Sequence, residues 1–375
     1  MSGIYVHIPF CRSKCIYCDF YSIALPSLIP DFCKALKKEI ASRNNTFSGK
    51  TINTIYFGGG TPSILDVNRI GDVISEIRKH YNISPDAEIT LEANPENITS
   101  EYLLALKRIG VNRLSIGIQS FDDEILKFLK RKHTATHAIE CVKTAAECGF
   151  DNISIDLIYG ITGLSNEKWR EELETAFTLP ITHLSCYCLG IEEGTLLHRF
   201  CRENRYTPCD DDTCLNQFLD FDKMSAEKGF THYEISNASK AGWQSRHNSS
   251  YWDRSEYLGF GPSAHSFVAN TRSWNIANVN EYIKCVTNDK TYSTSEILSD
   301  SDILEEYIML GLRTTNGIKL NEIEKLFGKD KSDKLNKAIA ELNPAYIHFV
   351  GDHLSLTAHG MFVSDNIIVN LLKKI

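Results

Sequence analysis

The chain has 375 residues, 42% of them hydrophobic, and carries a formal net charge of -8. The hydrophobic content is typical of a globular protein, and the negative charge argues against broad attraction to nucleic acid or to anionic membranes. No apolar run approaches the roughly 18 residues of a membrane span. The ten residues before the first cysteine leave no room for a signal peptide, so we expect a cytoplasmic protein whose twelve cysteines are reduced.

Short apolar runs alternate with helical patterns over the first two thirds of the chain. The runs are rich in β-branched or large apolar residues and are predicted strands: residues 4–8, 52–57, 88–93, 113–118, 153–158, 183–189 and, more weakly, 231–235. Between them apolar side chains recur at helical spacing, as at Phe32, Leu36 and Ile40. Alternating strands and helices predict a parallel sheet with helical crossovers, either a (β/α) barrel or an open doubly wound sheet.

Polar residues follow or close several of these predicted strands, and their placement favours the barrel. Cys11 follows the first strand, a glycine run the second, Glu92 and Gln119 end the third and fourth, and Asp156 lies in the fifth. In a barrel the chemistry gathers at the C-terminal ends of many strands. We therefore predict an α/β fold with a partial or complete TIM-like (β/α) barrel whose mouth is formed by these residues.

The remainder of the chain has a different texture. Residues 236–275 are crowded with Gly, Asn, Ser, His and aromatic residues, and we expect a long functional loop there. A boundary is predicted near Ile297, which gives a barrel domain at 1–297 and a small domain at 298–375. In the latter, Ser299 and Asp302 are suited to cap a helix, and residues 351–352 are a hairpin signal. Helices followed by a hairpin predict a winged-helix-like α+β domain.

Three cysteines lie within eight residues: Cys11, Cys15 and Cys18. Thiolates are soft ligands, and this spacing lets one loop surround a metal centre. An iron–sulfur cluster held by three cysteines leaves one iron open, whereas a structural zinc needs a fourth ligand, for which His7 is the candidate. Ordinary buried thiols are the third interpretation. Spacing alone leaves these alternatives open, with the cluster favoured.

Other polar residues are candidates for ligand binding, each with a simpler alternative. The run Gly58-Gly59-Gly60-Thr61-Pro62 lets a ligand approach the backbone closely, or forms only a tight turn. Glu92 is suited to an ammonium or a ribose hydroxyl, or to a salt bridge. Asp156 in an apolar strand must be paired or bind something. Arg131 is suited to a carboxylate, or is simply solvated.

Two histidines in the 236–275 segment, His247 and His265, are candidate ligands of a metal or a heme. The alternative is a hydrogen-bonded loop histidine, and nothing in their spacing selects between the two interpretations.

Together, the C-x3-C-x2-C motif, the GGGTP run and the polar strand ends resemble the radical SAM superfamily. Further motifs resemble the oxygen-independent coproporphyrinogen III oxidase group and its HemW heme-chaperone relatives: residues 5–10, 91–95, 115–120 and 156–160. The oxidase pattern continues with a fourth cysteine two residues past the third, where this chain has Phe20. Phe20 and the segment 247–252 (HNSSYW) resemble the heme-chaperone branch.

The resemblance implies that Cys11, Cys15 and Cys18 hold a [4Fe–4S] cluster that binds S-adenosylmethionine (SAM). It also implies SAM contacts from nine residues: Tyr5, Tyr17, Gly59, Gly60, Thr61, Glu92, Gln119, Arg131 and Asp156. The expected function is binding of heme and its transfer to an acceptor protein, with an electron donor for the cluster. The alternative is oxidative decarboxylation of coproporphyrinogen III. The heme ligands stay open between His247, His265 and several cysteines.

Overall fold

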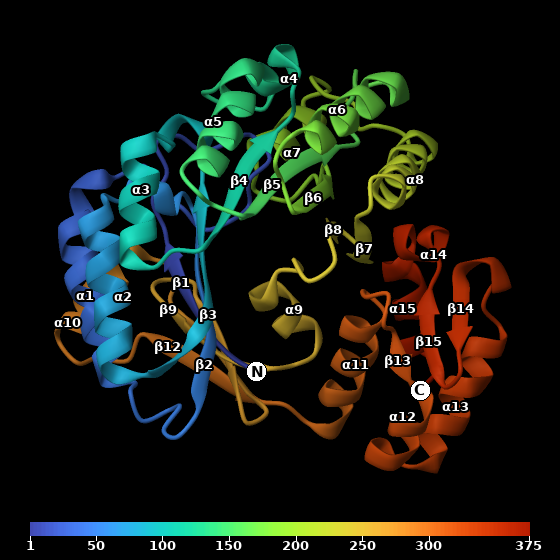
Figure 1. Ribbon diagram of the computed structural model, residues 1–375. Helices are drawn as coiled ribbons and strands as arrows, with labels where there is room; N and C mark the ends of the chain where they lie inside the picture. Colours follow the sequence, from blue (N-terminus) through green and yellow to red (C-terminus); the bar gives the residue numbers. More distant parts are fainter.

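A computed structural model describes residues 1–375, and its main feature is an open sheet of twelve strands (Figure 1). Six parallel strands lie side by side in chain order. They are β1 (Ser2–Ile8), β2 (Thr51–Gly59), β3 (Asn82–Ala93), β4 (Arg113–Gln119), β5 (Asn152–Tyr159) and β6 (His183–Cys188). Each of the first six predicted strands is therefore present. β3 begins at Asn82, well before the predicted start at residue 88, and the other strand ends differ by at most two residues.

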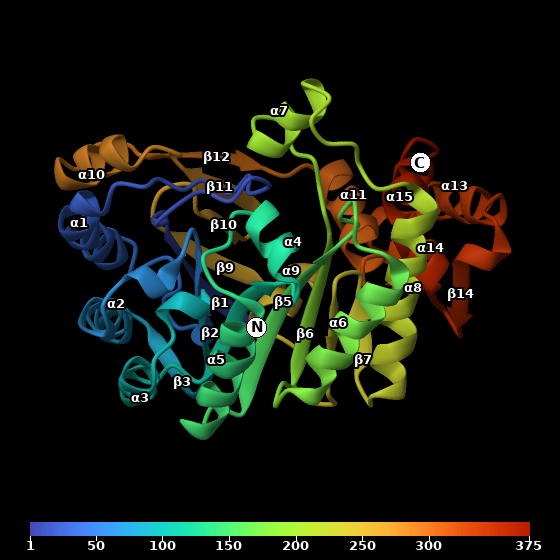
Figure 2. The ribbon, with the colours of Figure 1, turned by 90° about the horizontal axis from the view of Figure 1, so that it is seen from above.

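Helices follow each of these strands, most of them on the outer side of the sheet (Figure 1). The helices are α1 (Ile29–Ser42), α2 (Val67–His80), α3 (Ser100–Ile109), α4 (Asp123–Phe128), α5 (Ala135–Glu147), α6 (Asn166–Thr178), α7 (Leu196–Arg202) and α8 (Asp211–Glu227). Of these, α7 lies beyond the end of β6 (Figure 2). Short 3₁₀ turns lie at Pro26–Leu28, Pro62–Ile64, Pro95–Asn97 and Pro344–Tyr346. The side chains that predicted α1, Phe32, Leu36 and Ile40, are fully buried, which confirms the helical period.

The sheet does not close on itself, so the barrel is partial. Beyond β6 the order continues with β8 (Asn237–Ser239) and then the edge strand β7 (Thr231–Glu234), both in antiparallel pairings. The other edge is β12 (Ser293–Ile297). The C-terminal ends of β1 to β6 therefore form an arc, as the strand-end pattern predicted.

The expectation of a long loop at 236–275 was wrong. This segment forms β8, α9 (Arg246–Trp252), β9 (Glu256–Phe260), β10 (His265–Val268) and β11 (Thr271–Asn275), and α10 (Val279–Thr287) follows. The strand β9 pairs in parallel with β1, where Ser2 lies opposite Glu256. Because β1 is so distant in the chain, its pairing with β9 leaves no periodic pattern in the local sequence. Strands of three to five residues are also too short to show alternation of apolar and polar side chains.

The C-terminal part forms a separate three-stranded antiparallel sheet with helices around it. Its elements are α11 (Asp300–Gly311), β13 (Ile318–Lys319), α12 (Leu320–Phe327), α13 (Lys329–Ala340), β14 (Ile347–Val350), β15 (His353–Leu356), α14 (Ala358–Phe362) and α15 (Ser364–Leu372). Ser299 and Asp302 form a capping box on α11, and Gly351 has φ +61° in the two-residue turn, as predicted. This part lies beside α8, where Phe362 packs on Phe218 (Figure 2).

None of the helices combines the length and the apolar composition that crossing a membrane requires.

Candidate metal and cofactor site

The three cysteines lie on the loop that follows β1, which we call the cysteine loop (residues 11–18). Its base is closed by two backbone hydrogen bonds, from Cys11 N–H to Ile23 O (3.0 Å) and from Ile23 N–H to Pro9 O (2.8 Å). The side chain of Ile16 is 1% exposed and anchors the loop in the core. All three cysteines are partly exposed and form no disulfide. The loop is thus fixed at its base while its thiols remain accessible.

The surroundings of the thiols suit thiolate ligands. Thr61 Oγ1 donates to Cys11 Sγ at 3.4 Å, and Arg131 Nη1 donates to Cys15 Sγ at 3.5 Å. Burial raises the pKa of Cys18 to about 11, and the nearby thiols of Cys15 and Cys11 raise it further. The donors to Cys11 and Cys15 favour the charged forms of those two thiols. The donor set therefore fits a cluster held by three thiolates.

The structure does not support His7 as a fourth ligand of a zinc ion. His7 Nδ1 lies 3.1 Å from Tyr5 Oη, and His7 Nε2 lies 2.9 Å from Tyr21 O, so both ring nitrogens are engaged. Burial lowers the pKa of His7 to about 4. No three His, Cys, Asp or Glu side chains are arranged around one ion-sized centre. The zinc interpretation therefore lacks the fourth ligand that His7 was expected to provide.

The glycine run packs its backbone against the end of β1. Gly60 N–H donates to Ile8 O (2.8 Å), and Thr61 N–H donates to Phe10 O (2.8 Å). A Cβ atom at Gly60 would lie 2.7 Å from Phe10 O, and Gly59 has φ +106°. Glycine is thus needed for the turn itself. The same turn places the Thr61 hydroxyl on Cys11, which joins the run to the cysteine loop.

Two carboxyl groups lie on the inner face of the sheet, at β3 and β5. Glu92 accepts hydrogen bonds from Tyr56 Oη (2.8 Å) and from Gly59 N–H, while Asp156 accepts one from Ser115 Oγ (3.3 Å). Burial raises the pKa of Glu92 to about 7 and that of Asp156 to about 6, despite these bonds. Both carboxyls are poised near neutral pH, where a ligand that donates hydrogen bonds would favour their charged forms.

Arg131 connects the cysteine loop to β3 and β4. Its Nη2 donates to Asn94 Oδ1 at 2.8 Å and to Gly117 O at 2.6 Å, and Asn94 Nδ2 donates to Thr61 Oγ1 at 3.4 Å. Gln119 has φ 76° at a register shift in the β4–β5 pairing. Asn94 was missed as a site residue. Asn94 lies inside the 91–95 motif, but an amide after a strand has no distinctive spacing that would identify it as a site residue.

Tyrosines complete this surface. Tyr17 is hydrogen-bonded to Cys15, and burial raises the pKa of Tyr17. Tyr5 stacks on Tyr56 with ring centroids 6.2 Å apart. Tyr56 was also missed, because one tyrosine within an apolar strand resembles an ordinary core residue. The predicted residues on β1, β2, β3 and the cysteine loop are thus joined by direct contacts.

A cavity of about 880 Å³ separates the cysteine loop from α7. Lys14, Cys15 and Cys18 line one side, and Arg199 and Arg202 of α7 line the other. The cysteine loop is therefore open to a ligand or to a partner from this side.

The structure places the two candidate histidines in different environments. His247, in α9, is 1% exposed; its Nδ1 lies 2.8 Å from Thr54 Oγ1, and its Nε2 lies 2.8 Å from Tyr251 Oη. It stacks on Tyr56 at 5.0 Å, and burial lowers its pKa to about 3. His265 is exposed at the start of β10 and stacks on Trp274. Only His265 has an accessible side chain in this state.

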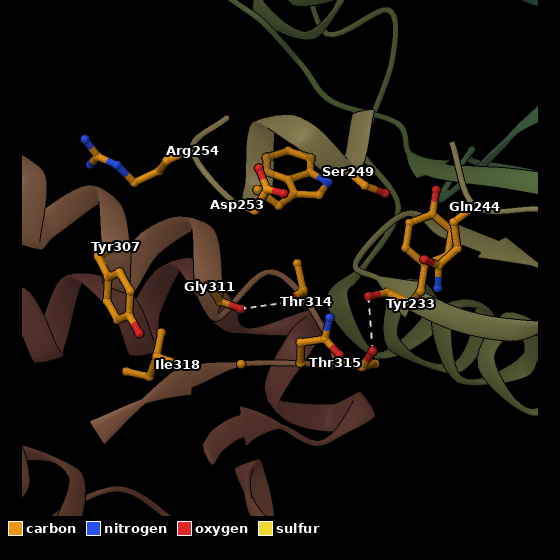
Figure 3. Close-up of a pocket in the computed structure, with 13 residues that line it drawn as sticks. Tyr233, Gln244, Ser249, Asp253, Arg254, Tyr307, Gly311, Thr314, Thr315 and Ile318 are labelled. Carbon is orange, nitrogen blue, oxygen red and sulfur yellow. Dashed lines mark hydrogen bonds between the residues drawn. The ribbon is translucent and has the colours of Figure 1, made fainter. Parts of the chain in front are cut away.

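A second cavity, of about 350 Å³, lies between α9 and the C-terminal part (Figure 3). Tyr233 and Arg254 line one side and Tyr307 and Ile318 the other, and Thr315 Oγ1 donates to Tyr233 O at 3.2 Å. None of the predicted ligands lines this cavity. We therefore place no cofactor in it.

An arc of parallel strands with a three-cysteine loop after the first strand defines a radical SAM protein. Residues 5–176 match the radical SAM superfamily, and residues 298–363 match the HemN C-terminal domain. The fold is similar to that of coproporphyrinogen III oxidase (HemN) from Escherichia coli, with a TM-score of 0.85 and 21% identity over 100% of this chain and 90% of that chain.

Curated relatives then define the branch. The chain is 32% identical to heme chaperone HemW of Mycobacterium tuberculosis (strain H37Rv), over 99% of this chain and 94% of the relative. It is also 32% identical to heme chaperone HemW of Bacillus subtilis (strain 168), over 98% of each, and 37% identical to that of Escherichia coli (strain K12), over 71% of this chain and 70% of the relative. The chain belongs to the HemW family.

This membership confirms the predicted branch. The radical SAM superfamily implies a [4Fe–4S] cluster and SAM, and the cysteine loop has the donors that such a cluster needs. The division into domains at residue 297 and the roles of single side chains stay predictions.

Proposed function

We propose that this chain is a heme chaperone that binds heme and transfers it to an acceptor protein. The observation that carries the proposal is similarity along nearly the whole chain to proteins named heme chaperone HemW. Phe20, whose side chain is 63% exposed beside the cysteine loop, adds support, because the resembled oxidase pattern has a cysteine at this position.

We propose that Cys11, Cys15 and Cys18 hold the [4Fe–4S] cluster. These three residues would hold a cluster that, once bound, would supply the electron for reductive cleavage of SAM. The chain contributes two things to this centre. Thr61 and Arg131 donate hydrogen bonds to ligand sulfurs, which lowers the energy of the thiolate form, and Ile16 fixes the loop from beneath.

We propose that SAM lies along the inner ends of β1 to β5. Glu92 and Asp156 provide acceptors for the ligand's ammonium or ribose hydroxyl groups, and Arg131 provides a cation for its carboxylate. Gly58 lets the Glu92 side chain pack close to the backbone, since a Cβ atom at Gly58 would lie 2.9 Å from Glu92 Oε1. Tyr5, Tyr17, Gly59, Gly60, Thr61 and Gln119 complete the proposed set.

For heme, we propose His265 as the ligand that is available without rearrangement, because its side chain is exposed. Coordination by His247 would require α9 to move, since both ring nitrogens of His247 are hydrogen-bonded inside the barrel. Titration of heme into His265→Ala and His247→Ala, followed by the Soret band, separates the two. Loss of binding only in His247→Ala would show that α9 opens.

The function is tested by mixing the iron-reconstituted chain with heme and, separately, with coproporphyrinogen III. We expect a stable heme complex that passes heme to an apo-hemoprotein, and no protoporphyrinogen IX. Turnover to protoporphyrinogen IX without retained heme would instead identify the oxidase, and its electron donor would then be sought by reconstitution.

A further inference from the structure

A second group of thiols gathers near the mouth of the barrel, apart from the cysteine loop. Cys188 is the last residue of β6 and is exposed, Cys214 is buried in the first turn of α8, and Cys209 precedes α8. A Cβ atom placed on Gly160 would lie 2.9 Å from Cys188 Sγ and 3.1 Å from Cys214 Sγ. The two sulfur atoms therefore approach the same point from two different elements.

Hydrogen bonds within the group make its members chemically unequal. The Cys214 thiol bonds to Cys188, and the Tyr159 hydroxyl bonds to Cys188 as well. The bond from Cys214 lowers the pKa of Cys188, while the bond to Cys188 raises the pKa of Cys214. An exposed thiol with a lowered pKa beside a buried thiol with a raised pKa is the arrangement of an attacking and a resolving cysteine.

A metal site is a poorer interpretation of these residues. Cys209 is hydrogen-bonded to Cys214, so all three thiols are close, but they are not arranged around one ion-sized centre. The sulfur atoms of Cys188 and Cys214 instead converge on one point beside Gly160, and such an approach is what a disulfide requires.

We propose that Cys188 and Cys214 form a dithiol that hydrogen peroxide oxidises to a disulfide. The Cys188 thiolate attacks one peroxide oxygen, the O–O bond breaks, and a sulfenic acid and hydroxide form. The Cys214 sulfur then attacks the sulfenic sulfur, the S–O bond breaks, and water leaves as the S–S bond forms. In total two thiols lose two protons and two electrons, and one peroxide becomes two waters.

The position of the pair gives this disulfide a structural consequence. The segment between its two cysteines, residues 189–213, contains α7, which walls the cavity beside Cys15 and Cys18. Within this segment Leu197 N–H donates to Ile16 O of the cysteine loop at 2.8 Å. Oxidation therefore ties both ends of the segment that covers the cysteine loop.

The test uses the full chain, reconstituted with iron and sulfide so that the cysteine loop is occupied, and then treated with hydrogen peroxide. After alkylation of free thiols and tryptic digestion without reductant, mass spectrometry should find the peptides of Cys188 and Cys214 joined. Arg199, Arg202 and Arg205 lie between them, so the joined peptides separate only when dithiothreitol is added. Fragmentation spectra must assign the sulfur atoms, because Cys209 shares the tryptic peptide of Cys214, and Cys186 shares that of Cys188. A disulfide from Cys209 in place of this pair would overturn the assignment.

Variants sharpen the result. Cys188→Ser and Cys214→Ser should abolish the joined peptide, whereas Cys148→Ser and Cys201→Ser, which remove other partly exposed thiols, should leave it unchanged. In Cys214→Ser the sulfenic acid on Cys188 should persist, and its dimedone adduct should rise on the order of tenfold over wild type. An equal adduct in both chains would refute the resolving role of Cys214. If Cys188→Ser does not fold, the comparison of wild type with Cys214→Ser still decides whether Cys214 resolves the sulfenic acid.

Discussion

The cysteine loop and the helix α9 present opposite kinds of side chain within the same barrel. The cysteines are partly exposed, and Cys11 and Cys15 accept hydrogen bonds from Thr61 and Arg131 at 3.4 and 3.5 Å. His247 of α9 is buried, and both of its ring nitrogens are satisfied at 2.8 Å. Groups ready for a ligand are accessible, whereas a buried group with both nitrogens hydrogen-bonded stabilises the fold.

The largest effect is expected where the loop loses a ligand. Cys15→Ser should abolish iron binding and SAM cleavage, because a serine hydroxyl is a hard, protonated donor in place of a thiolate. Iron and sulfide analysis with anaerobic absorbance near roughly 400 nm measures the loss.

Cys148→Ser is the matched control, since it removes a partly exposed thiol remote in sequence from the loop. Full iron content in Cys15→Ser would exclude the cysteine loop as the cluster site. Unchanged heme binding in that variant would show that the heme site is independent of the cluster.

The structural role of His247 is tested by its effect on the free energy of unfolding. His247→Ala should lower the free energy of unfolding by about 4 kcal/mol, because it leaves a cavity against Tyr56 and unpaired hydroxyls on Thr54 and Tyr251. His265→Ala, at an exposed position, should change it by less than about 0.5 kcal/mol. Urea unfolding of both variants measures the difference. Equal stabilities would mean that His247 is not part of the packed interior.

The same contrast explains what could be predicted from the sequence. The cysteine loop and the first six strands were predicted because their signals are local: three thiols in eight residues, and apolar runs of strand length. The 236–275 segment was misread because β9 pairs with β1, a strand at the other end of the barrel sequence. The regular structure of the segment comes from that pairing rather than from a periodic pattern. Tyr56 and Asn94 were missed for a related reason: only their neighbours in space give them a role.

Glu92 is expected to give the smallest but most specific effect, because it lies at the mouth of the barrel and is largely enclosed. Between its ordinary pKa of 4.5 and its folded value of about 7, the folded chain retains a proton that the unfolded chain has lost. The free energy of unfolding must therefore fall as the pH rises through this window.

Glu92→Gln has no such proton, so its unfolding free energy relative to wild type should rise between pH 5 and pH 8. We expect about 1 to 2 kcal/mol, less than the whole shift implies, because the side chain retains some exposure. The buried histidines His7 and His247 titrate in both proteins and cancel in the difference. Glu147→Gln, at an exposed position, should show no such trend. If SAM binds this carboxylate, saturating SAM should reduce the difference in unfolding free energy between Glu92→Gln and wild type at pH 8. A ligand that donates hydrogen bonds stabilises the charged form of the largely enclosed carboxylate.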